Sequence, residues 1–338
     1  MRRSLVWAAA YLAVQSQLSM ADGQLLKDVV FDSRGALADN EEMVRRLLSP
    51  LTGARLHEQV LLKGKPFAGQ AINIVDEHFT VYVPSHRPNE GYGLLVFVPP
   101  WDDARVPTEW IRSLEEFGII LVSAARSGND QSVLSRRYPL ALLAFDNIER
   151  RYSLDLKRVY VGGFSGGARV ALRLALGYPD VFSGVILNAG SDPIGTRELP
   201  LPPAEYVHQF QDSTRIVYLT GDRDSDVLAD DMSSQAELRH WCVFNVYRHT
   251  LPLTGHELAG GSAFRQALVD LLEPPKTDTL RLSGCRSSVS QELENRFQHL
   301  LELKSKGRVT EASRVLAEID ERFGGIAAPR SVELAGQR

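Results

Sequence analysis

Residues 159–171 have the sequence VYVGGFSGGARVA, and this stretch decides the fold. Its β-branched and aromatic start is typical of a buried strand, and the Ala, Leu and Arg-rich run that follows is typical of a helix. Between them Gly163, Ser165 and Gly167 match the G-x-S-x-G pattern of a nucleophile elbow. A serine on so tight a turn needs neighbours with almost no side-chain volume, and the helix behind it directs free N–H groups toward an anion formed there.

A cluster of Gly and Ser between a strand and a helix is also typical of an ordinary loop. Two phosphate-binding patterns were compared with the stretch, and both fail. The pattern G-x-x-x-x-G-K-S/T fits Gly162 and Gly167, but an Ala-Arg dipeptide follows where Lys and Ser or Thr are required, and G-x-G-x-x-G does not occur here. The strand before the serine and the helix after it favour the elbow.

The composition is that of an ordinary globular protein, with 338 residues of which 44% are hydrophobic and 24% charged. This length fits one domain of about 250 residues with an appendage. The net charge of −4 gives no basic surplus that would indicate binding to nucleic acid. Two cysteines, Cys242 and Cys285, exclude a disulfide-rich scaffold and a cysteine-rich metal site; one disulfide and two buried thiols remain alternatives.

Residues 1–21 have the features of a secretory signal peptide. Arg2 and Arg3 supply the positive start, residues 5–14 are apolar, and small residues precede a cut at Asp22. The apolar run is too short for a membrane span, and no second hydrophobic stretch suggests a membrane anchor. We therefore expect an exported protein, periplasmic or secreted, with an ordinary N-terminal helix as the alternative.

Apolar strands alternate with helices along most of the chain. The elements expected in order are a helix (40–48, ended by Pro50 and Gly53), a strand-like region (56–83) with a hairpin (70–75 and 78–83), a strand (93–98), a helix (108–117), a strand (119–123), a helix (140–151), the elbow, three strands (184–188, 215–220 and 242–247) and a helix (262–272). This alternation predicts an α/β fold with a mostly parallel central sheet and helices on both faces. Ligands of such sheets bind at the carboxyl ends of the strands.

The character of the chain changes after Pro274 and Pro275. Residues 292–304 and 310–323 are charged, leucine-containing helices, and they form an αα-hairpin that resembles one tetratricopeptide-like unit. One such unit cannot stand alone, so we expect it to pack on the main domain or on a protein partner, followed by a loose tail after Pro329. The expected parts of the chain are a signal peptide (1–21), a main domain (22–275) and a helical hairpin with its tail (276–338).

An elbow serine needs an orienting carboxylate and then a histidine, in that chain order. After the strand at 215–220 comes an acidic loop with Asp222, Asp224 and Asp226, and spacing alone does not choose among them. Asp192, after the strand that ends near residue 188, is the next candidate.

The expected base is His256, in a loop that follows the last predicted strand and precedes a helix. His249 lies too close to that strand, and His240 lies before it. Because eight histidines are present, a loop histidine of no importance is the alternative.

The sequence around the elbow resembles the α/β-hydrolase superfamily. The matching motifs are YxxDxxRVYVGGFSGG at residues 152–167, YPDxFxGV at residues 178–185 and Ala-Gly at residues 189–190. The closest groups are the secreted polyhydroxybutyrate-depolymerase-like, feruloyl-esterase-like and dienelactone-hydrolase-like esterases, and the resemblance covers about residues 79–272. It implies an α/β-hydrolase fold and selects Asp224, because the superfamily often places the acid in Gly-x-x-Asp-x-x-Val; the final Gly-His corresponds to Gly255 and His256.

One loop departs from the superfamily, which usually has His-Gly after the strand that ends at Val98. Here Pro99, Pro100 and Trp101 follow. Proline has no N–H to donate, so the expected oxyanion hole consists of the N–H groups of Gly166 and Trp101. We also expect the side chains of Trp101 and Phe164 to bind substrate.

These residues predict a serine hydrolase that cleaves small-molecule or polymer carboxylic esters through Ser165, Asp224 and His256, without a metal or cofactor. A peptidase of the same fold is one alternative. A catalytically weak scaffold that binds a ligand or a partner through the C-terminal hairpin is another. The intact triad argues against the scaffold, and the altered loop at residues 99–101 argues for it.

Overall fold

The computed structural model describes residues 23–62, 72–276 and 278–336, so the predicted signal peptide lies outside the described residues. The strands are β1 (Gln24–Val30), β2 (His78–Val83), β3 (Tyr92–Val98), β4 (Ile119–Ala124), β5 (Leu154–Phe164), β6 (Gly184–Asn188), β7 (Arg215–Gly221) and β8 (Val246–Leu251). The α-helices are α1 (Asn40–Leu47), α2 (Pro50–Leu62), α3 (Ile111–Phe117), α4 (Tyr138–Arg151), α5 (Gly166–Gly177), α6 (Ala204–Ser213), α7 (Ser225–His240), α8 (Gly261–Leu272), α9 (Thr279–Ser305), α10 (Val309–Phe323) and α11 (Arg330–Gly336). Shorter helical turns are η1 (Ala36–Ala38), η2 (Ile74–Asp76), η3 (Thr108–Trp110), η4 (Val133–Arg137, a π-helix) and η5 (Gly324–Ala327).

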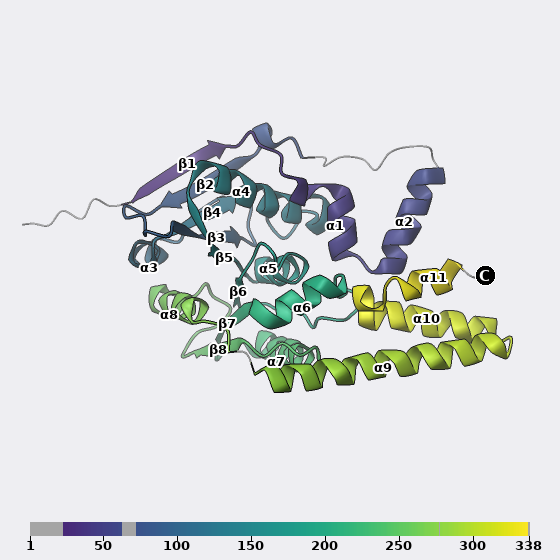
Figure 1. Ribbon diagram of the computed structural model, residues 1–338. Coiled ribbons are helices and arrows are strands. Elements are labelled where there is room, and N and C mark those ends of the chain that lie inside the picture. The colour runs from purple at the N-terminus through teal and green to yellow at the C-terminus, as the bar shows by residue number, and fades with distance from the viewer. Residues whose placement is uncertain (1–22, 63–71, 277, 337–338) are drawn as a thin grey trace, which may run out of the picture.

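One eight-stranded sheet crosses the molecule from β1 to β8 (Figure 1). Its order is β1-β2-β4-β3-β5-β6-β7-β8. The six strands from β4 to β8 in this order pair in parallel, while β2 is antiparallel to both β4 and β1. The carboxyl ends of the parallel strands therefore meet at one edge, and every loop that carries a predicted site residue leaves from that edge.

Alternate residues of the central strands enter two cores, one on each face of the sheet. Leu94 and Val96 of β3 join a core that includes α4 and α5, whereas Leu95 and Phe97 join a second core with α3 and α8. Figure 1 shows these two helix pairs on opposite sides of the sheet. A strand buried on both faces needs a continuous apolar run, which explains residues 93–98. The predicted α/β-hydrolase fold class, with helices on both faces, is confirmed.

The predicted hairpin at residues 70–83 is wrong. Residues 70 and 71 lie outside the described part of the chain, Ile74–Asp76 is the turn η2, and β2 pairs instead with β1 and β4. The strand-like region assigned from residue 56 is also wrong, because residues 56–62 belong to α2. Pro50 begins this helix rather than ending the previous one, since the fixed φ of proline suits a first helical position.

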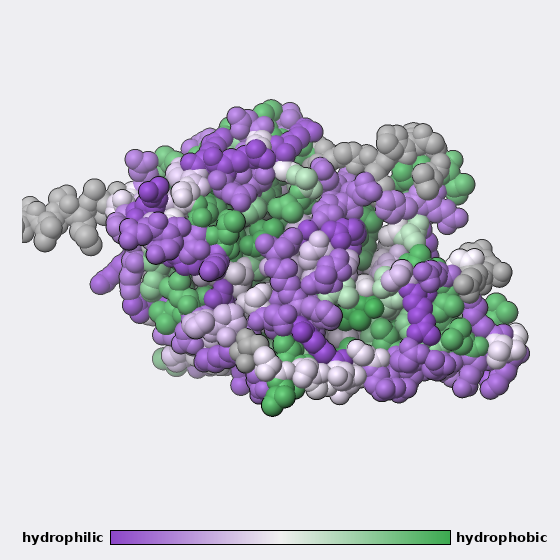
Figure 2. Space-filling view, in the orientation of Figure 1, coloured by the Kyte–Doolittle hydropathy of each residue, from purple (hydrophilic) through white to green (hydrophobic). Residues whose placement is uncertain are grey.

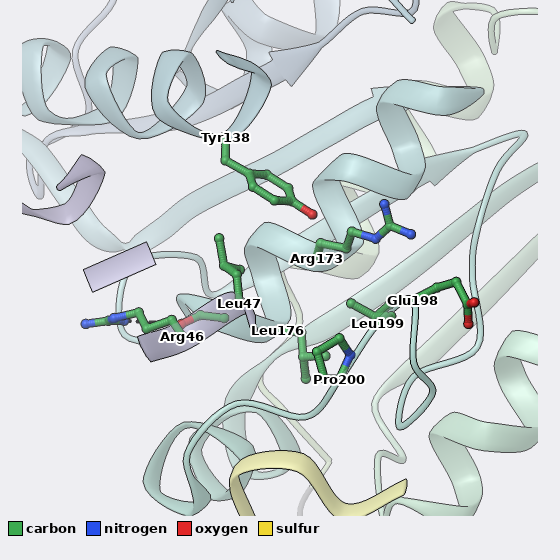
Figure 3. A pocket seen from close by; sticks show the side chains of 9 residues that line it. Arg46, Leu47, Tyr138, Arg173, Leu176, Glu198, Leu199 and Pro200 are labelled. Atoms are coloured by element: carbon green, nitrogen blue, oxygen red, sulfur yellow. Dashed lines mark hydrogen bonds between the residues drawn. The ribbon is translucent and has the colours of Figure 1, made fainter. Parts of the chain in front are cut away.

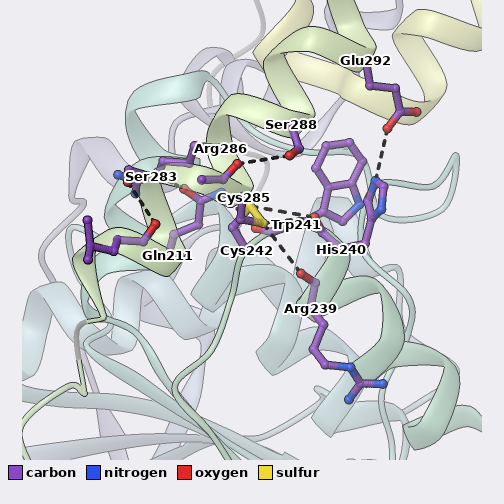
Figure 4. Close-up of a disulfide and its surroundings, with 12 residues drawn as sticks. Gln211, Arg239, His240, Trp241, Cys242, Ser283, Cys285, Arg286, Ser288 and Glu292 are labelled. Atoms are coloured by element: carbon purple, nitrogen blue, oxygen red, sulfur yellow. Dashed lines mark hydrogen bonds and ion pairs between the residues drawn. A yellow bond between two sulfur atoms is a disulfide. The ribbon is translucent and has the colours of Figure 1, made fainter.

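The predicted strand at residues 242–247 begins only at Val246. Cys242 has a φ of 61°, which an extended strand does not allow, and it forms a disulfide with Cys285 at the start of α9 (Figure 4). The described structure therefore has the disulfide and not the alternative of two thiols. The bond joins the loop after α7 to the C-terminal hairpin.

The predicted hairpin of charged helices is present as α9 and α10, and it packs on the main domain (Figure 1). Phe323, at the end of α10, is fully buried, and its ring lies 5.6 Å from that of Trp241. The loose tail predicted after Pro329 is wrong, because α11 follows. Arg330 there forms an ion pair with Glu294 of α9, with an N–O distance of 2.7 Å.

Hydrophilic side chains cover most of the face shown in Figure 2, with smaller apolar areas between them. Leu280 and Val309, at the starts of α9 and α10, are among the exposed apolar residues. Of the helices in the described ranges, none is both long and apolar enough to span a bilayer.

Candidate active site

Ser165 lies between β5 and α5 in a strained backbone conformation, with φ 54° and ψ −123°. Its N–H donates to the carbonyl oxygen of Asn188 at 2.8 Å, which holds the turn against the neighbouring strand. A Cβ on Gly163 would lie 2.3 Å from the Gly167 carbonyl oxygen, and a Cβ on Gly167 would lie 2.0 Å from that of Val98. Both glycines are therefore required by close backbone contacts, and the strain at the serine is sustained by its surroundings.

Ser165, His256 and Asp224 form a chain of hydrogen bonds. His256 Nε2 lies 2.8 Å from Ser165 Oγ, and His256 Nδ1 lies 2.7 Å from Asp224 Oδ2. The side chain of Asp224 is 10% exposed, whereas that of His256 is 45% exposed. A half-exposed imidazole between a hydroxyl and a largely buried carboxylate has the arrangement needed to accept a proton from the serine.

The other aspartates of the acidic loop do not contact His256. Asp222 Oδ1 accepts a hydrogen bond from the Thr254 N–H at 3.2 Å, and Asp226 lies in the first turn of α7. Spacing alone left three aspartates open, and the structure brings only Asp224 of them to the histidine among the described contacts.

The remaining candidates from the sequence have other partners. His249 Nε2 lies 2.5 Å from Asp270 Oδ2, and His240 Nε2, at the end of α7, lies 3.8 Å from Glu292 Oε2. Asp192 is bound by both Arg169 and Arg173. These side chains are engaged in contacts that do not involve Ser165.

Asn188 holds the histidine loop, a role the sequence did not reveal. Its side chain is 1% exposed, its Nδ2 donates to the Leu219 carbonyl at 2.9 Å, and its Oδ1 accepts from the Ala259 N–H at 2.7 Å. The available signal was an amide at the end of the otherwise apolar strand β6. A buried amide needs hydrogen-bond partners, and those of Asn188 lie in β7 and in the segment after His256.

The predicted oxyanion donors lie on two segments that touch. Gly166 is the first residue of α5, so its N–H has no partner within the helix. The close contact between Gly167 and the Val98 carbonyl brings the loop of Trp101 to the same helix end. Within the described part of the chain the Trp101 N–H donates no hydrogen bond. Both groups therefore remain available, and their roles as oxyanion donors stay predictions.

Aromatic rings form a row that ends at the triad. The ring centroids of Trp101 and Phe97 are 6.4 Å apart, those of Trp101 and Phe164 are 6.0 Å apart, and those of Phe164 and His256 are 5.2 Å apart. Trp101 thus packs against the second core at Phe97. Together with Phe164 it also forms an apolar surface that reaches His256. The guanidinium of Arg105 lies over the indole of Trp101, 4.2 Å from the ring centroid.

Two cavities lie away from the triad. One, of about 10 Å³, is lined by residues that include Arg46, Tyr138 and Arg173 (Figure 3), and it has room for about one water molecule. Burial raises the pKa of Tyr138, whose hydroxyl points toward Arg173, to about 12. The other, of about 280 Å³, lies between α7 and the strands β7 and β8. Neither lining includes a triad residue.

No protein-family model matches the sequence. No curated protein matches it either.

Solved structures of hydrolases are similar to part of the chain. A structure described as S-formylglutathione hydrolase (FrmB) from Staphylococcus aureus has 12% identity and a TM-score of 0.47, with 58% of this chain and 93% of that chain covered. A ferulic acid esterase has 13% identity and a TM-score of 0.46, with 73% of this chain and 95% of that chain covered. Est1E from Butyrivibrio proteoclasticus has 15% identity and a TM-score of 0.43, with 58% of this chain and 95% of that chain covered. Similarity at this level assigns no activity or substrate to this chain, and membership of the esterase groups named above stays a prediction.

Proposed function

We propose that this protein is a serine hydrolase that cleaves carboxylic esters through an acyl-enzyme. The observation that carries the proposal is the chain of hydrogen bonds from Asp224 through His256 to Ser165, built on a serine held in a strained turn. A half-buried serine of this geometry at a helix N-terminus is suited to attack a carbonyl carbon.

In the first half of the reaction Ser165 Oγ attacks the ester carbonyl while His256 Nε2 takes the hydroxyl proton. The negative charge that develops on the carbonyl oxygen is stabilised by the Gly166 and Trp101 N–H groups. The tetrahedral intermediate then collapses, the C–O bond to the alcohol breaks, and the alcohol leaves with the proton from His256. In the second half water attacks the acyl carbon and His256 takes its proton. The bond between that carbon and Ser165 Oγ then breaks, His256 returns the proton to Oγ, and the acid is released.

Asp224 orients the base. By accepting the Nδ1–H of His256, it leaves the Nε2 lone pair directed at Ser165 Oγ. Its carboxylate also stabilises the imidazolium that forms after proton transfer. With 10% of its side chain exposed, Asp224 is shielded from solvent, so this attraction is screened less than at the surface.

The substrate we propose is an ester with an apolar acyl or aryl group, either a small molecule or a polymer segment. The row of Trp101 and Phe164 beside His256 supports this choice, because flat aromatic side chains bind apolar groups by stacking and burial. The open position of His256 leaves room for a chain that continues beyond the reacting bond.

We further propose that the protein is exported, as the sequence of residues 1–21 predicts. The disulfide between Cys242 and Cys285 supports this proposal, since such bonds persist mainly in oxidising compartments. Protein from the native cell should begin near Asp22, and an intact Met1 in its mass spectrum would refute export.

Hydrolysis of p-nitrophenyl esters of increasing acyl length tests the activity. We expect turnover by the purified protein and loss of it in Ser165→Ala, with kcat/KM rising with acyl length until the aromatic row is covered. A peptide p-nitroanilide serves as the comparison, because faster turnover of the anilide would favour a peptidase. No turnover of either class would favour the non-catalytic scaffold.

A further inference from the structure

The loop after β4 is bound along its length to the loop that carries Trp101. The Arg126 N–H donates to the Asp102 carbonyl at 2.6 Å, and the Gly128 N–H donates to the Asp102 carboxylate at 2.9 Å. The Asn129 N–H donates to the Pro100 carbonyl at 3.0 Å. These bonds join the two loops into one wall at the carboxyl edge of the sheet.

The carboxamide of Asn129 lies directly on the first residue of α5. A Cβ placed on Gly166 would lie 2.2 Å from Asn129 Oδ1 and 3.1 Å from Asn129 Nδ2. Any larger residue at position 166 would have to displace this side chain. Asn129 is therefore adjacent to Gly166, whose N–H is the first expected oxyanion donor.

A buried arginine lies behind this wall. Arg137 is 3% exposed, its Nη2 donates to the Pro99 carbonyl at 2.9 Å, and its Nη1 donates to Asn129 Oδ1 over a longer 3.4 Å. Among the described residues no carboxylate forms an ion pair with it, and burial lowers its pKa to about 10. A guanidinium without a paired carboxylate is costly to bury, and both of its partners belong to the two loops of the site.

The arginine determines which atom of the Asn129 amide faces Arg137. Arginine can only donate hydrogen bonds, so the Asn129 atom that it contacts must be the oxygen. The amide nitrogen, with its two N–H groups, is then directed away from Arg137. Asn129 is exposed, so this nitrogen is accessible to a ligand.

We propose that the Asn129 side-chain N–H is a donor to the oxyanion, oriented by Arg137. It would supply the hydrogen bond that Pro99 and Pro100 cannot give, beside the N–H groups of Gly166 and Trp101. The inference rests on the proposed function, since it assigns a residue to the same acyl transfer. Side-chain amides act in this role in other hydrolases, where losing one donor lowers kcat by about 10²–10³-fold.

Two substitutions of Asn129 distinguish a hydrogen-bond donor from a residue that only fills space. Asn129→Ala removes the donor, and we expect kcat for a p-nitrophenyl ester to fall about 10²–10³-fold with KM little changed. Asn129→Asp keeps the shape but places an acceptor at the oxyanion, so we expect a loss at least as large. A residue that only fills space would tolerate Asp. Asp130→Ala, on the exposed neighbour, is the matched control and should stay within about twofold.

A transition-state analogue gives a second readout. Inhibition by an aryl boronic acid, which forms a tetrahedral adduct with serine, should weaken in Asn129→Ala by the same factor as kcat/KM. Arg137→Lys should lower kcat as well, and adding Asn129→Ala to it should then cost much less than in the wild type, because the two residues act together.

The outcomes distinguish this inference from the proposed function. If the wild type hydrolyses esters and Asn129→Ala retains kcat within about threefold, the role of Asn129 is overturned and the triad stands. If Asn129→Ala loses activity but Asn129→Asp does not, Asn129 is a spacer and not a donor. If the wild type neither hydrolyses esters nor reacts at Ser165, both proposals are overturned.

Discussion

The carboxyl edge of the sheet and the C-terminal hairpin are held by different kinds of contact. At the edge, backbone meets backbone: the Gly167 Cα packs on the Val98 carbonyl, and the Ser165 N–H bonds to the Asn188 carbonyl. The hairpin meets the main domain through many side-chain contacts, among them the disulfide between Cys242 and Cys285 (Figure 4). Backbone meets backbone just after α10, where the Gly325 N–H donates to the Leu201 carbonyl at 2.8 Å.

Side-chain contacts continue along the hairpin. Arg322 of α10 donates to Glu237 of α7 at 2.7 Å, its guanidinium lies 4.9 Å from the Trp241 ring centroid, and Arg286 of α9 donates to Gln211 at 2.6 Å. The difference indicates a division of labour. Backbone contacts fix atoms within a narrow range, as catalysis requires, whereas side-chain contacts attach an element whose exact position matters less.

If this division holds, substitutions at the edge should affect turnover far more than stability. For Asp224→Asn we expect kcat to fall about 10³–10⁴-fold, because the histidine would be held in the wrong tautomer, with Tm little changed. Asp222→Asn and Asp226→Asn are the matched controls from the same loop. Equal, small effects of all three on ester hydrolysis would place the acid elsewhere.

Substitutions at the hairpin should affect stability far more than turnover. The disulfide closes a loop between cysteines 43 residues apart, and removing such a link costs about 2–4 kcal/mol of unfolding free energy. We expect Cys242→Ala with Cys285→Ala to lower Tm in thermal melts while kcat and KM stay within about twofold. A large fall in kcat in protein that is still folded would show that the hairpin shapes the site.

The smallest effect on activity is expected at Trp101, which offers the site both a backbone N–H and a side-chain ring. Trp101→Ala keeps the backbone N–H, so kcat should fall only a few-fold, while KM for an aryl ester should rise about tenfold through loss of the ring. Trp101→Phe, which retains an aromatic face, should restore most of the affinity. A loss confined to kcat in both variants would contradict a contact between the ring and substrate.

The strands at the edge could be predicted because their sequences need no information from elsewhere. Residues 93–98, 119–123 and 184–188 are apolar runs buried on both faces, and a run of that kind specifies a central strand by itself. The elbow was predictable from its local pattern, and the contact between Gly163 and Gly167 lies within that motif. The contact of Gly167 with Val98 lies far away in the sequence and could not be read from it.

Other elements depend on partners that are distant in the sequence. β1 exists because it pairs with β2, and the short apolar run at residues 60–62 of α2 suits a strand as well as a helix. In α7 the apolar residues do not recur at helical spacing, so that helix was missed. Tertiary packing determines the secondary structure of all three elements, β1, α2 and α7.

The candidate site shows the same limit. Ser165 and His256 follow from local motif and chain order, whereas Asp224 is selected among three aspartates only through the resemblance to the α/β-hydrolase superfamily. The contacts of Asn188 and Asn129 do not follow from the sequence, because each joins its loop to a segment far along the chain: Ala259 in one case and Gly166 in the other.

Covalent labelling of Ser165 tests the central claim most directly. A fluorophosphonate reacts with a serine hydroxyl only when a base activates it, and here His256 lies 2.8 Å from that hydroxyl. We expect stoichiometric labelling of the full-length protein, with the adduct on the peptide that contains Ser165, and none in Ser165→Ala. Labelling that persists in Ser165→Ala, or a wild-type protein that does not react, would contradict the account.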